Sequence, residues 1–278
     1  MTTPTEPVLV TGASTGIGLA VVRRLATGGT PVLAAVRNEA DAAKLAAIAN
    51  VEPLILDVTD ADDVAALAER LDGSRLSGLV NNAGIAVAGP LEELSLDEWR
   101  RQFDVNLFGL VAVTKASIGA LRAGHGRIVN VGSIGGRIGQ PFVGPYSASK
   151  GAVHLLTESL RRELMPWKIW VAVVEPGAVA TPIWSKGTDA SAQILDRISP
   201  AGRERYGAQL GQMAKVIAKQ EGSAIGPDIV AQAVEHALTA KRPRSSYVLG
   251  REARISLVLS RVLPAQMMDR LIARVIGL

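Results

Sequence analysis

Near its N-terminus the chain reads Val8-Leu9-Val10-Thr11-Gly12-Ala13-Ser14-Thr15-Gly16-Ile17-Gly18, and this stretch decides the fold. Its first four residues are an apolar run that predicts a buried strand, and a helical pattern follows over Ile17–Thr27. Three glycines occupy the junction between the two. Glycine lets a backbone approach a pyrophosphate closely, and the N-terminus of a helix attracts its negative charge. The stretch therefore predicts the first strand and helix of a dinucleotide-binding fold.

The same alternation of strand and helix continues outward from this stretch. Apolar runs predict further buried strands at Pro31–Val36, Glu52–Leu56, Gly78–Val80, Gly126–Val131, Ile169–Val174 and Ser246–Leu249. Helical patterns lie between them at Glu39–Ala49, Ala61–Leu71, Leu96–Leu121 and Pro145–Met165. This order indicates right-handed βαβ units and a parallel, doubly wound sheet. We therefore expect an α/β protein with a single Rossmann-type domain over residues 1–278.

Composition narrows the classes of function. Of the 278 residues 48% are hydrophobic and 20% are charged, as in globular proteins, and the lack of Cys excludes disulfides and thiolate chemistry. His125, His154 and His236 lack the spacing of metal ligands, so we expect no metal site. The chain has no basic stripe with aromatic platforms, so we expect no nucleic-acid partner. Met1–Pro7 shows no signal-peptide pattern, and we expect a cytoplasmic protein.

A candidate reaction centre lies in the second half, at Tyr146-Ser147-Ala148-Ser149-Lys150. Residues four apart on a helix face the same way, so Tyr146 and Lys150 are neighbours. The pKa of a Tyr hydroxyl is about 10, and an adjacent ammonium favours the phenolate, so the pair can donate and accept a proton. Ser133 ends an expected strand and can donate a hydrogen bond to a substrate carbonyl. Each residue alone has an ordinary explanation, but their order at successive strand ends favours catalysis.

The residues at the end of the second expected strand indicate which nicotinamide cofactor binds. An NAD site usually carries Asp or Glu there, which accepts hydrogen bonds from the ribose hydroxyls. This chain has Val36 followed by Arg37, and a guanidinium without a carboxylate favours a 2′-phosphate, hence NADP(H). The alternative is that Arg37 is a solvated residue that opens the next helix. Asp57, at the end of the third strand, can accept from the adenine amino group or serve in local turn and capping bonds.

Two asparagine segments are further candidates. Asn81-Asn82-Ala83-Gly84 follows the fourth strand and can bridge neighbouring backbones beside a cofactor, although these residues are also common in plain turns. Asn106 lies inside an apolar helical stretch, where an unpaired buried amide would be costly. We therefore expect the Asn106 amide to bond to backbone or water, which is compatible with a role in a proton relay.

Two regions depart from the alternation. Residues 177–226 follow a strand end and have helical patterning, which predicts a substrate lid, the alternative being a pair of surface helices. The tail, about 251–278, carries an apolar stripe over Gln266–Leu278, with Pro264 suited to the first helical turn. From Lys241 onward eight basic residues face two acidic ones, a net charge of +6. We expect the tail to dock on the body or a partner subunit; the alternative is a basic amphipathic element at a membrane surface.

These motifs together resemble the short-chain dehydrogenase/reductase family. The resemblance runs from about Pro7 to Thr181 and rests on Thr11–Gly18, Asp57, Asn81–Gly84, Asn106, Ser133, Tyr146, Lys150, Pro176-Gly177 and Thr181. It implies that Tyr146 is the general acid in reduction and the base in oxidation. Lys150 would bind the nicotinamide ribose and lower the pKa of Tyr146, Ser133 would position the reacting oxygen, and Asn106 would hold a water in the proton path.

The resemblance also implies where a nicotinamide cofactor binds. The implied residues are Gly12, Ser14, Thr15, Gly16, Ile17, Gly18, Arg37, Asp57, Val58, Asn82, Ala83, Gly84, Tyr146, Lys150, Pro176, Gly177, Val179 and Thr181. One departure matters. Many NADP-binding members carry Lys or Arg directly before the second motif glycine, and this chain has Thr15 there. Arg37 alone therefore argues for the phosphate.

Within the family, Ser159–Leu164, Ile169–Thr181 and a tail that begins near Arg242-Pro243-Arg244 resemble the retinol and hydroxysteroid dehydrogenase branch. This likeness implies a lipophilic alcohol or carbonyl substrate, although similarity to a branch does not fix the substrate. Family resemblance further implies a homodimer or homotetramer, formed through the long helices expected at 96–121 and 145–165.

We therefore expect an oxidoreductase that transfers hydride between NADP(H) and an alcohol/carbonyl pair. The alternatives are an NAD-dependent alcohol dehydrogenase of the same family, an epimerase or dehydratase of the wider superfamily, a membrane-surface adaptor and a cofactor-binding scaffold without turnover. The combination of Asn106, Ser133, Tyr146 and Lys150 argues against the scaffold, because binding alone does not require Tyr146.

Overall fold

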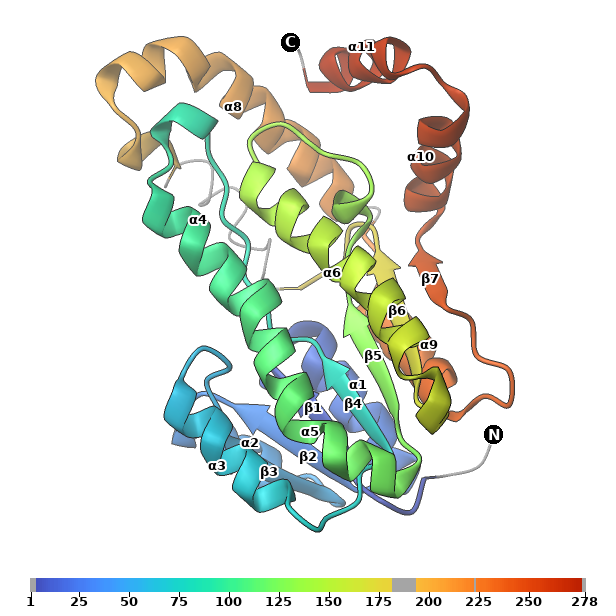
Figure 1. Cartoon of the computed structure of the whole chain (residues 1–278). Helices are drawn as coiled ribbons and strands as arrows, with labels where there is room; N and C mark the ends of the chain where they lie inside the picture. Colours follow the sequence, from blue (N-terminus) through green and yellow to red (C-terminus); the bar gives the residue numbers. More distant parts are fainter. Residues whose placement is uncertain (1–3, 182–193, 223, 277–278) are drawn as a thin grey trace.

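Seven parallel strands form the central sheet of the computed structural model, which describes residues 4–181, 194–222 and 224–276. The strands are β1 (Val8–Thr11), β2 (Val32–Val36), β3 (Val51–Ile55), β4 (Gly78–Asn81), β5 (Arg127–Val131), β6 (Trp170–Pro176) and β7 (Ser246–Leu249). Their order is β3-β2-β1-β4-β5-β6-β7, so the direction of winding reverses between β1 and β4. The predicted parallel Rossmann-type α/β fold is confirmed (Figure 1).

Helices cover both faces of the sheet because its strands are apolar on both sides. One face packs against α1 (Gly16–Thr27), α2 (Glu39–Ala46) and α9 (Pro227–Thr239), and the other against α3 (Ala61–Leu71), α5 (Leu110–Gly124) and α6 (Gly144–Glu163). Successive residues of β1 show the alternation. Val8 and Val10 share a buried cluster with Leu25 of α1, whereas Leu9 packs with Leu121 of α5.

The helix expected over Leu96–Leu121 is divided into three parts. It begins as α4 (Leu96–Phe103), passes through a π-helical turn over Asp104–Gly109 and continues as α5. The three parts follow one line in Figure 1. Single π-turns inside α-helices are frequently found at functional sites. This one holds Asn106, so the interruption coincides with a predicted site residue.

By length and composition alone, the combined helix Leu96–Gly124 is apolar enough to cross a membrane. Its packing provides another explanation, since 44% of its most apolar window is buried inside the protein. Val113 and Leu121 belong to the core that α5 forms against the sheet. The apolar character of this helix is that of a core helix in a doubly wound fold.

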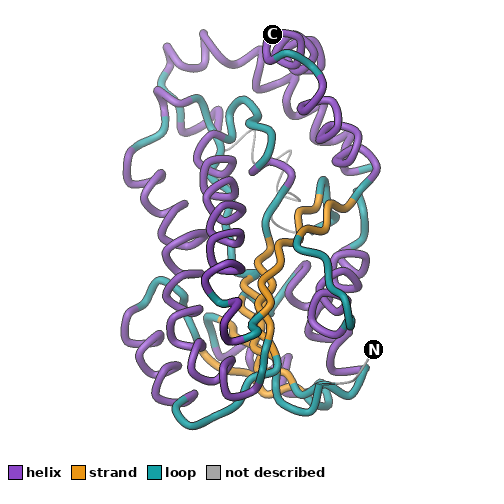
Figure 2. Tube along the Cα trace, turned by 45° about the vertical axis from the view of Figure 1, so that its right-hand side comes forward, coloured by secondary structure: helices purple, strands orange, loops and turns teal. Residues whose placement is uncertain are grey.

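The C-terminal third adds helices beyond the carboxyl ends of the strands (Figure 1, Figure 2). They are α8 (Pro200–Glu221), α10 (Arg251–Val262) and α11 (Ala265–Ile276). The sequence predicted the last of these, which begins directly after Pro264, but α10 was not predicted as a separate helix. Ile183 and Trp184, two apolar residues of the expected lid, lie outside the described residues.

Candidate active site

A pocket of about 740 Å³ opens at the carboxyl ends of the strands, where their order reverses. Open α/β sheets bind their ligands at this place. Eighteen of the predicted residues line it: Gly12, Ser14, Thr15, Gly16, Ile17, Arg37, Asp57, Val58, Asn82, Ala83, Gly84, Ser133, Tyr146, Lys150, Pro176, Gly177, Val179 and Thr181. Gly18 and Asn106 are not among the lining residues. The fold thus brings motifs from along the whole chain into one pocket.

The glycine turn forms a tight backbone cradle at one side of the pocket. Gly12 has a φ of +63°, and a Cβ there would lie 2.9 Å from the Cα of Ala83. A Cβ on Gly18 would lie 2.1 Å from the carbonyl oxygen of Gly12, so Gly18 packs behind the turn. Thr15 caps α1 without a side-chain hydrogen bond, which leaves the first-turn N–H groups to other acceptors. These features fit the pyrophosphate of a dinucleotide.

The asparagine segment after β4 is bonded directly to the glycine turn. Asn82 donates from Nδ2 to the carbonyl oxygens of Thr11 and Gly12, at 2.9 and 3.0 Å. In return, the hydroxyl of Thr11 accepts from the backbone N–H groups of Asn82 and Ala83, both at 3.0 Å. The expectation that an Asn of this segment bridges neighbouring backbones is confirmed for Asn82.

The far end of the pocket holds Arg37 and Asp57, which follow β2 and β3. Asp57 accepts from the backbone N–H and the hydroxyl of Thr59, at 2.9 and 2.7 Å. Burial acts to raise the pKa of Asp57, but the Thr59 hydrogen bonds and the charge of Arg37 hold it below its usual value. The exposed Arg37 side chain is thus close enough to act on Asp57 electrostatically.

Tyr146 and Lys150 are buried together near the middle of the pocket. Burial raises the pKa of the Tyr146 hydroxyl, partly offset by its hydrogen bond with Ser133, and burial lowers the pKa of Lys150 to about 8. Lys150 donates from Nζ to the carbonyl oxygen of Val131 at 2.8 Å and lies 6.0 Å from the centre of the Tyr146 ring. The expected lowering of the Tyr146 pKa by Lys150 is therefore not seen, because burial disfavours the charged form of each group.

Behind the pocket wall, two amides clamp the segment that follows β4. Asn106 accepts from the N–H of Ile85 at 2.9 Å and donates to its carbonyl at 3.1 Å. Gln102, one turn earlier, accepts from the N–H of Val87 at 2.6 Å and also donates to the carbonyl of Ile85 at 2.9 Å. Asn106 further donates to the hydroxyl of Ser149, the neighbour of Lys150. The Asn106 amide is thus bonded to backbone, as expected.

Sequence reasoning missed several residues of the site. Gln102 is fully buried but resembles any polar residue of an amphipathic helix, and only its contact with the segment after β4 identifies it. Arg101 lines the pocket from α4, again without a motif. The lining residues Ile85, Ala86 and Val105 are apolar and gave no signal of their own. Their positions next to Gly84 and Asn106 were the available hint.

Apolar side chains gather on the side of Tyr146 that faces the C-terminal helices. Tyr146 packs with Val143 and with Met213 of α8, and Ile272 of α11 joins the same cluster. The chain that enters the insertion is bonded to the chain that leaves it, since Ala180 donates to the carbonyl of Ile225 at 3.1 Å. The two ends of the insertion are therefore paired with each other, and Met213 of α8 packs against Tyr146.

The residues directly before α8 are attached to α4 and to the turn that precedes it through polar contacts. Glu93 accepts from the backbone N–H and the hydroxyl of Ser199, both at 2.9 Å, which lowers the pKa of Glu93. Arg197 forms an ion pair with Glu98 of α4 at 2.9 Å. The N-terminal end of α8 is thus held by polar groups, and Met213, further along α8, by apolar packing.

Comparisons with known proteins agree with this geometry. The family model for short chain dehydrogenases matches residues 6–192. Human retinol dehydrogenase 16 is 36% identical over 273 residues, 94% of this chain and 86% of that protein. The NADPH-dependent 3-dehydrocapnine reductase of Ornithobacterium rhinotracheale is 31% identical over 274 residues, 95% and 94% of the two chains. A short chain dehydrogenase from Burkholderia cenocepacia J2315, solved with NADP, superposes with a TM-score of 0.76 at 26% identity, over 98% and 99% of the chains.

Proposed function

The chain belongs to the short chain dehydrogenase family, and on that premise we propose that it transfers hydride between NADP(H) and a lipophilic alcohol/carbonyl pair. The observation that carries the proposal is the meeting of Ser133, Tyr146 and Lys150 in the pocket that the glycine turn borders. The cradle at Gly12 and the uncapped start of α1 fit a nicotinamide dinucleotide. Once bound, the nicotinamide ring would supply or accept the hydride.

Each residue of the centre has a role in this proposal. Tyr146 gives its proton to the substrate oxygen in reduction and takes it back in oxidation, and Ser133 holds that oxygen by a hydrogen bond. Lys150 donates to the Val131 carbonyl and keeps two N–H groups for further acceptors, such as ribose hydroxyls. Asn106 holds Ile85 and Ser149 in place, and its role in a proton relay remains a prediction.

The preference for NADP(H) rests on Arg37. This arginine follows β2 and reaches the adenosine end of the pocket, where a guanidinium pairs well with a phosphate. The structural relative from Burkholderia cenocepacia was solved with NADP, and the relative from Ornithobacterium is named an NADPH-dependent reductase, which supports the same cofactor here.

Titration with NADPH and NADH, followed by the fluorescence of the bound nicotinamide, tests this preference. We expect NADPH to bind at least tenfold more tightly, a difference of about 1.4 kcal/mol. Arg37→Gln should abolish the difference by weakening NADPH alone. Arg101→Gln, a change at the other pocket arginine, should leave the ratio of the two affinities unchanged. Equal binding of both cofactors by the unaltered protein would contradict the proposal and favour an NAD-dependent alcohol dehydrogenase.

The proposed substrate is lipophilic because the wall beside Tyr146 is apolar. Val143 and Met213 form a buried cluster with Tyr146, and Phe142, Val216, Ile217 and Ile272 pack against that cluster. One curated relative is a retinol dehydrogenase, whose named substrate is an apolar alcohol. We assign the insertion around α8 as the substrate lid.

We also propose the domain extent, the location and the assembly of the protein. We propose one domain over the whole chain, a cytoplasmic protein, and a homodimer or homotetramer through α4–α5 and α6. Exposed apolar side chains on these helices support the oligomer, since Phe108 is 59% and Leu155 67% exposed. We further propose that the tail contacts a membrane surface, because α10 and α11 present apolar and basic side chains to the outside.

A further inference from the structure

A buried carboxylate lies next to the reaction centre but takes no part in the chemistry above. Glu175 is the residue of β6 before Pro176, and its side chain is 1% exposed. One carboxylate oxygen lies 2.7 Å from Nε of Arg137 and 3.2 Å from Nδ1 of His154. The other accepts from Nη2 of Arg137 at 3.0 Å and from the hydroxyl of Ser246 at 2.7 Å. A charge this deeply buried is retained only with several partners.

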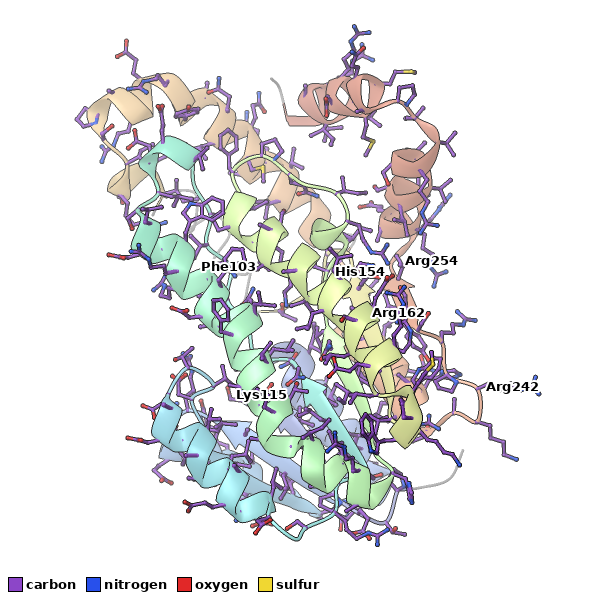
Figure 3. All side chains as sticks on the ribbon, viewed as in Figure 1. Phe103, Lys115, His154, Arg162, Arg242 and Arg254 are labelled. Carbon is purple, nitrogen blue, oxygen red and sulfur yellow. The ribbon has the colours of Figure 1, made fainter. Side chains whose placement is uncertain are left out.

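The partners of Glu175 come from the segments that carry the reaction centre. Arg137 follows Ser133 by four residues, at the end of the short 3-10 turn Ile134–Gly136. His154, which Figure 3 labels on α6, follows Lys150 by four residues, one helical turn. Glu175 itself precedes two residues that line the pocket. One carboxylate therefore connects the Ser133 turn, the helix of Tyr146 and Lys150, and the strand at the pocket wall.

The Ser133 turn is held at its start by the N–H of Gly132, which donates to the carbonyl of Val174 in β6 at 2.8 Å, and beyond Ser133 it rests on α6 and the contact with Glu175. The hydroxyl of Ser133 accepts from the N–H of Gly135 at 3.1 Å, and its carbonyl accepts from the N–H of Gly136 at 3.0 Å. A Cβ on Gly136 would lie 2.5 Å from the carbonyl carbon of Lys150, so the turn rests directly on the backbone of α6. The two parallel hydrogen bonds from Arg137 to Glu175 fix the free end of the turn in both distance and angle.

We propose that Arg137 and Glu175 are positioning residues, which hold the Ser133 hydroxyl where it can bond the substrate oxygen that Tyr146 protonates. The inference rests on the proposed function, since it assigns the pair a task in that reaction. Small displacements of a hydroxyl beside a reacting oxygen reduce the rate strongly, while cofactor affinity depends on other parts of the pocket. Loss of the pair should therefore reduce kcat and leave NADPH binding intact.

The test compares two ion pairs in the full-length protein. Arg137→Met alone leaves a buried charge without a partner and can prevent folding, so the main variant is the double change Arg137→Met/Glu175→Met, which removes both charges. The control is Arg24→Met/Glu235→Met, which removes the 2.7 Å pair between α1 and α9. We expect the site variant to fold, to bind NADPH within twofold of the unaltered protein and to lose at least tenfold in kcat for carbonyl reduction. The control should keep its kcat.

A second readout needs no turnover. In the protein without cofactor, the amides of Gly135, Gly136 and Arg137 should exchange their hydrogens faster in the site variant than in the control variant. Arg137→Lys, which keeps the charge but not the paired hydrogen bonds, should give an intermediate kcat. Unchanged exchange together with an unchanged kcat in the site variant would overturn the proposal. If the unaltered protein shows no turnover while the exchange still changes, the proposed function fails and the positioning of the turn stands.

Discussion

At the scale of single residues, the buried charge of Lys150 lowers the free energy of unfolding of the protein. Burial lowers its pKa from 10.5 to about 8, which makes the charged form unfavourable inside the protein. The shift corresponds to roughly 3 kcal/mol at neutral pH. The hydrogen bond from Lys150 to the Val131 carbonyl offsets about 1 kcal/mol of this cost. The proposed function requires this lysine, and stabilities below the optimum are common where function needs such a residue.

Replacement of Lys150 by Met should therefore stabilise the protein and abolish activity. The sign follows from the pKa. Below pH 8 the lysine is charged in both states and the full cost applies, whereas between pH 8 and 10.5 the unfolded state binds more protons and the cost disappears. We expect Lys150→Met to be more stable by up to about 2 kcal/mol at pH 7, with no advantage near pH 10.5. Urea unfolding at both pH values measures this, with the exposed Lys115→Met as control. An advantage that does not depend on pH would contradict the explanation.

Individual residues also show which parts of the candidate site could be predicted from the sequence and which could not. Ser133, Tyr146 and Lys150 could be found because their side-chain chemistry is rare in this order. Gln102 and Glu175 could not be found, because their importance comes from neighbours distant in sequence. Glu175 meets Arg137 across 38 positions and Ser246 across 71. A strand-end carboxylate carries no signal of its own until the fold supplies these partners.

At the scale of elements, α1 packs so closely against the glycine turn that position 18 has no space for a side chain. A Cβ on Gly18 would lie 2.1 Å from the Gly12 carbonyl oxygen and 2.6 Å from Nδ2 of Asn82. Gly18→Ala must therefore push α1 away from the turn. We expect a loss of about 1–3 kcal/mol in stability, as for other overpacked sites, and at least tenfold weaker NADPH binding.

The matched control for this change is Gly119→Ala in α5, where an added Cβ meets nothing within 4 Å. Alanine favours the helix, so this variant should gain about 0.5–1 kcal/mol and bind NADPH normally. Thermal unfolding and the fluorescence titration measure both properties. Normal NADPH binding by Gly18→Ala would show that the turn tolerates displacement, contrary to our account of the cradle.

Element boundaries show why the sequence predicted some segments better than others. The strands are short apolar runs between turn residues, and all seven predicted starts fall within one residue of the observed ones. The helix over Leu96–Leu121 was predicted as continuous because its apolar pattern does not stop. The π-turn at Asp104–Gly109 is instead accompanied by tertiary bonds from Asn106 to Ile85, which no pattern along the chain can indicate.

At the scale of the whole molecule, the reaction centre and the outer surface are connected through the tail. Ile272 of α11 faces inward and joins the apolar cluster around Tyr146. The outward side of the same helices exposes Val258, Val262 and Val275, which are 58%, 72% and 57% exposed. The same two helices carry the basic residues Arg254, Arg261, Arg270 and Arg274. Arg242 points away from the body in Figure 3, and the exposed Arg254 donates from Nε to the carbonyl of Val248 at 3.1 Å. The sequence left docking and membrane contact as alternatives, and the structure shows contact with the body together with an apolar outer side.

We therefore expect the full-length protein to bind anionic vesicles through this surface. Each basic side chain near such a membrane contributes about 1 kcal/mol, and salt weakens the attraction. Sedimentation with vesicles of phosphatidylcholine and phosphatidylglycerol should recover the protein at low salt, whereas vesicles of phosphatidylcholine alone should not. Arg254→Gln/Arg261→Gln/Arg270→Gln should lower recovery strongly, and Val258→Ser/Val262→Ser should lower it at every salt concentration.

The exposed apolar residues of the proposed oligomer surface provide the control for this experiment. Phe108→Ser and Leu155→Ser remove apolar side chains of similar exposure from the π-turn before α5 and from α6, without any change in the tail. These variants should sediment with anionic vesicles as the unaltered protein does, because no basic tail residue is lost. Equal losses in both sets of variants would mean that recovery depends on apolar exposure in general. No recovery of the unaltered protein with anionic vesicles would contradict membrane binding by the tail. The partner of its exposed apolar side chains would then be a second protein chain.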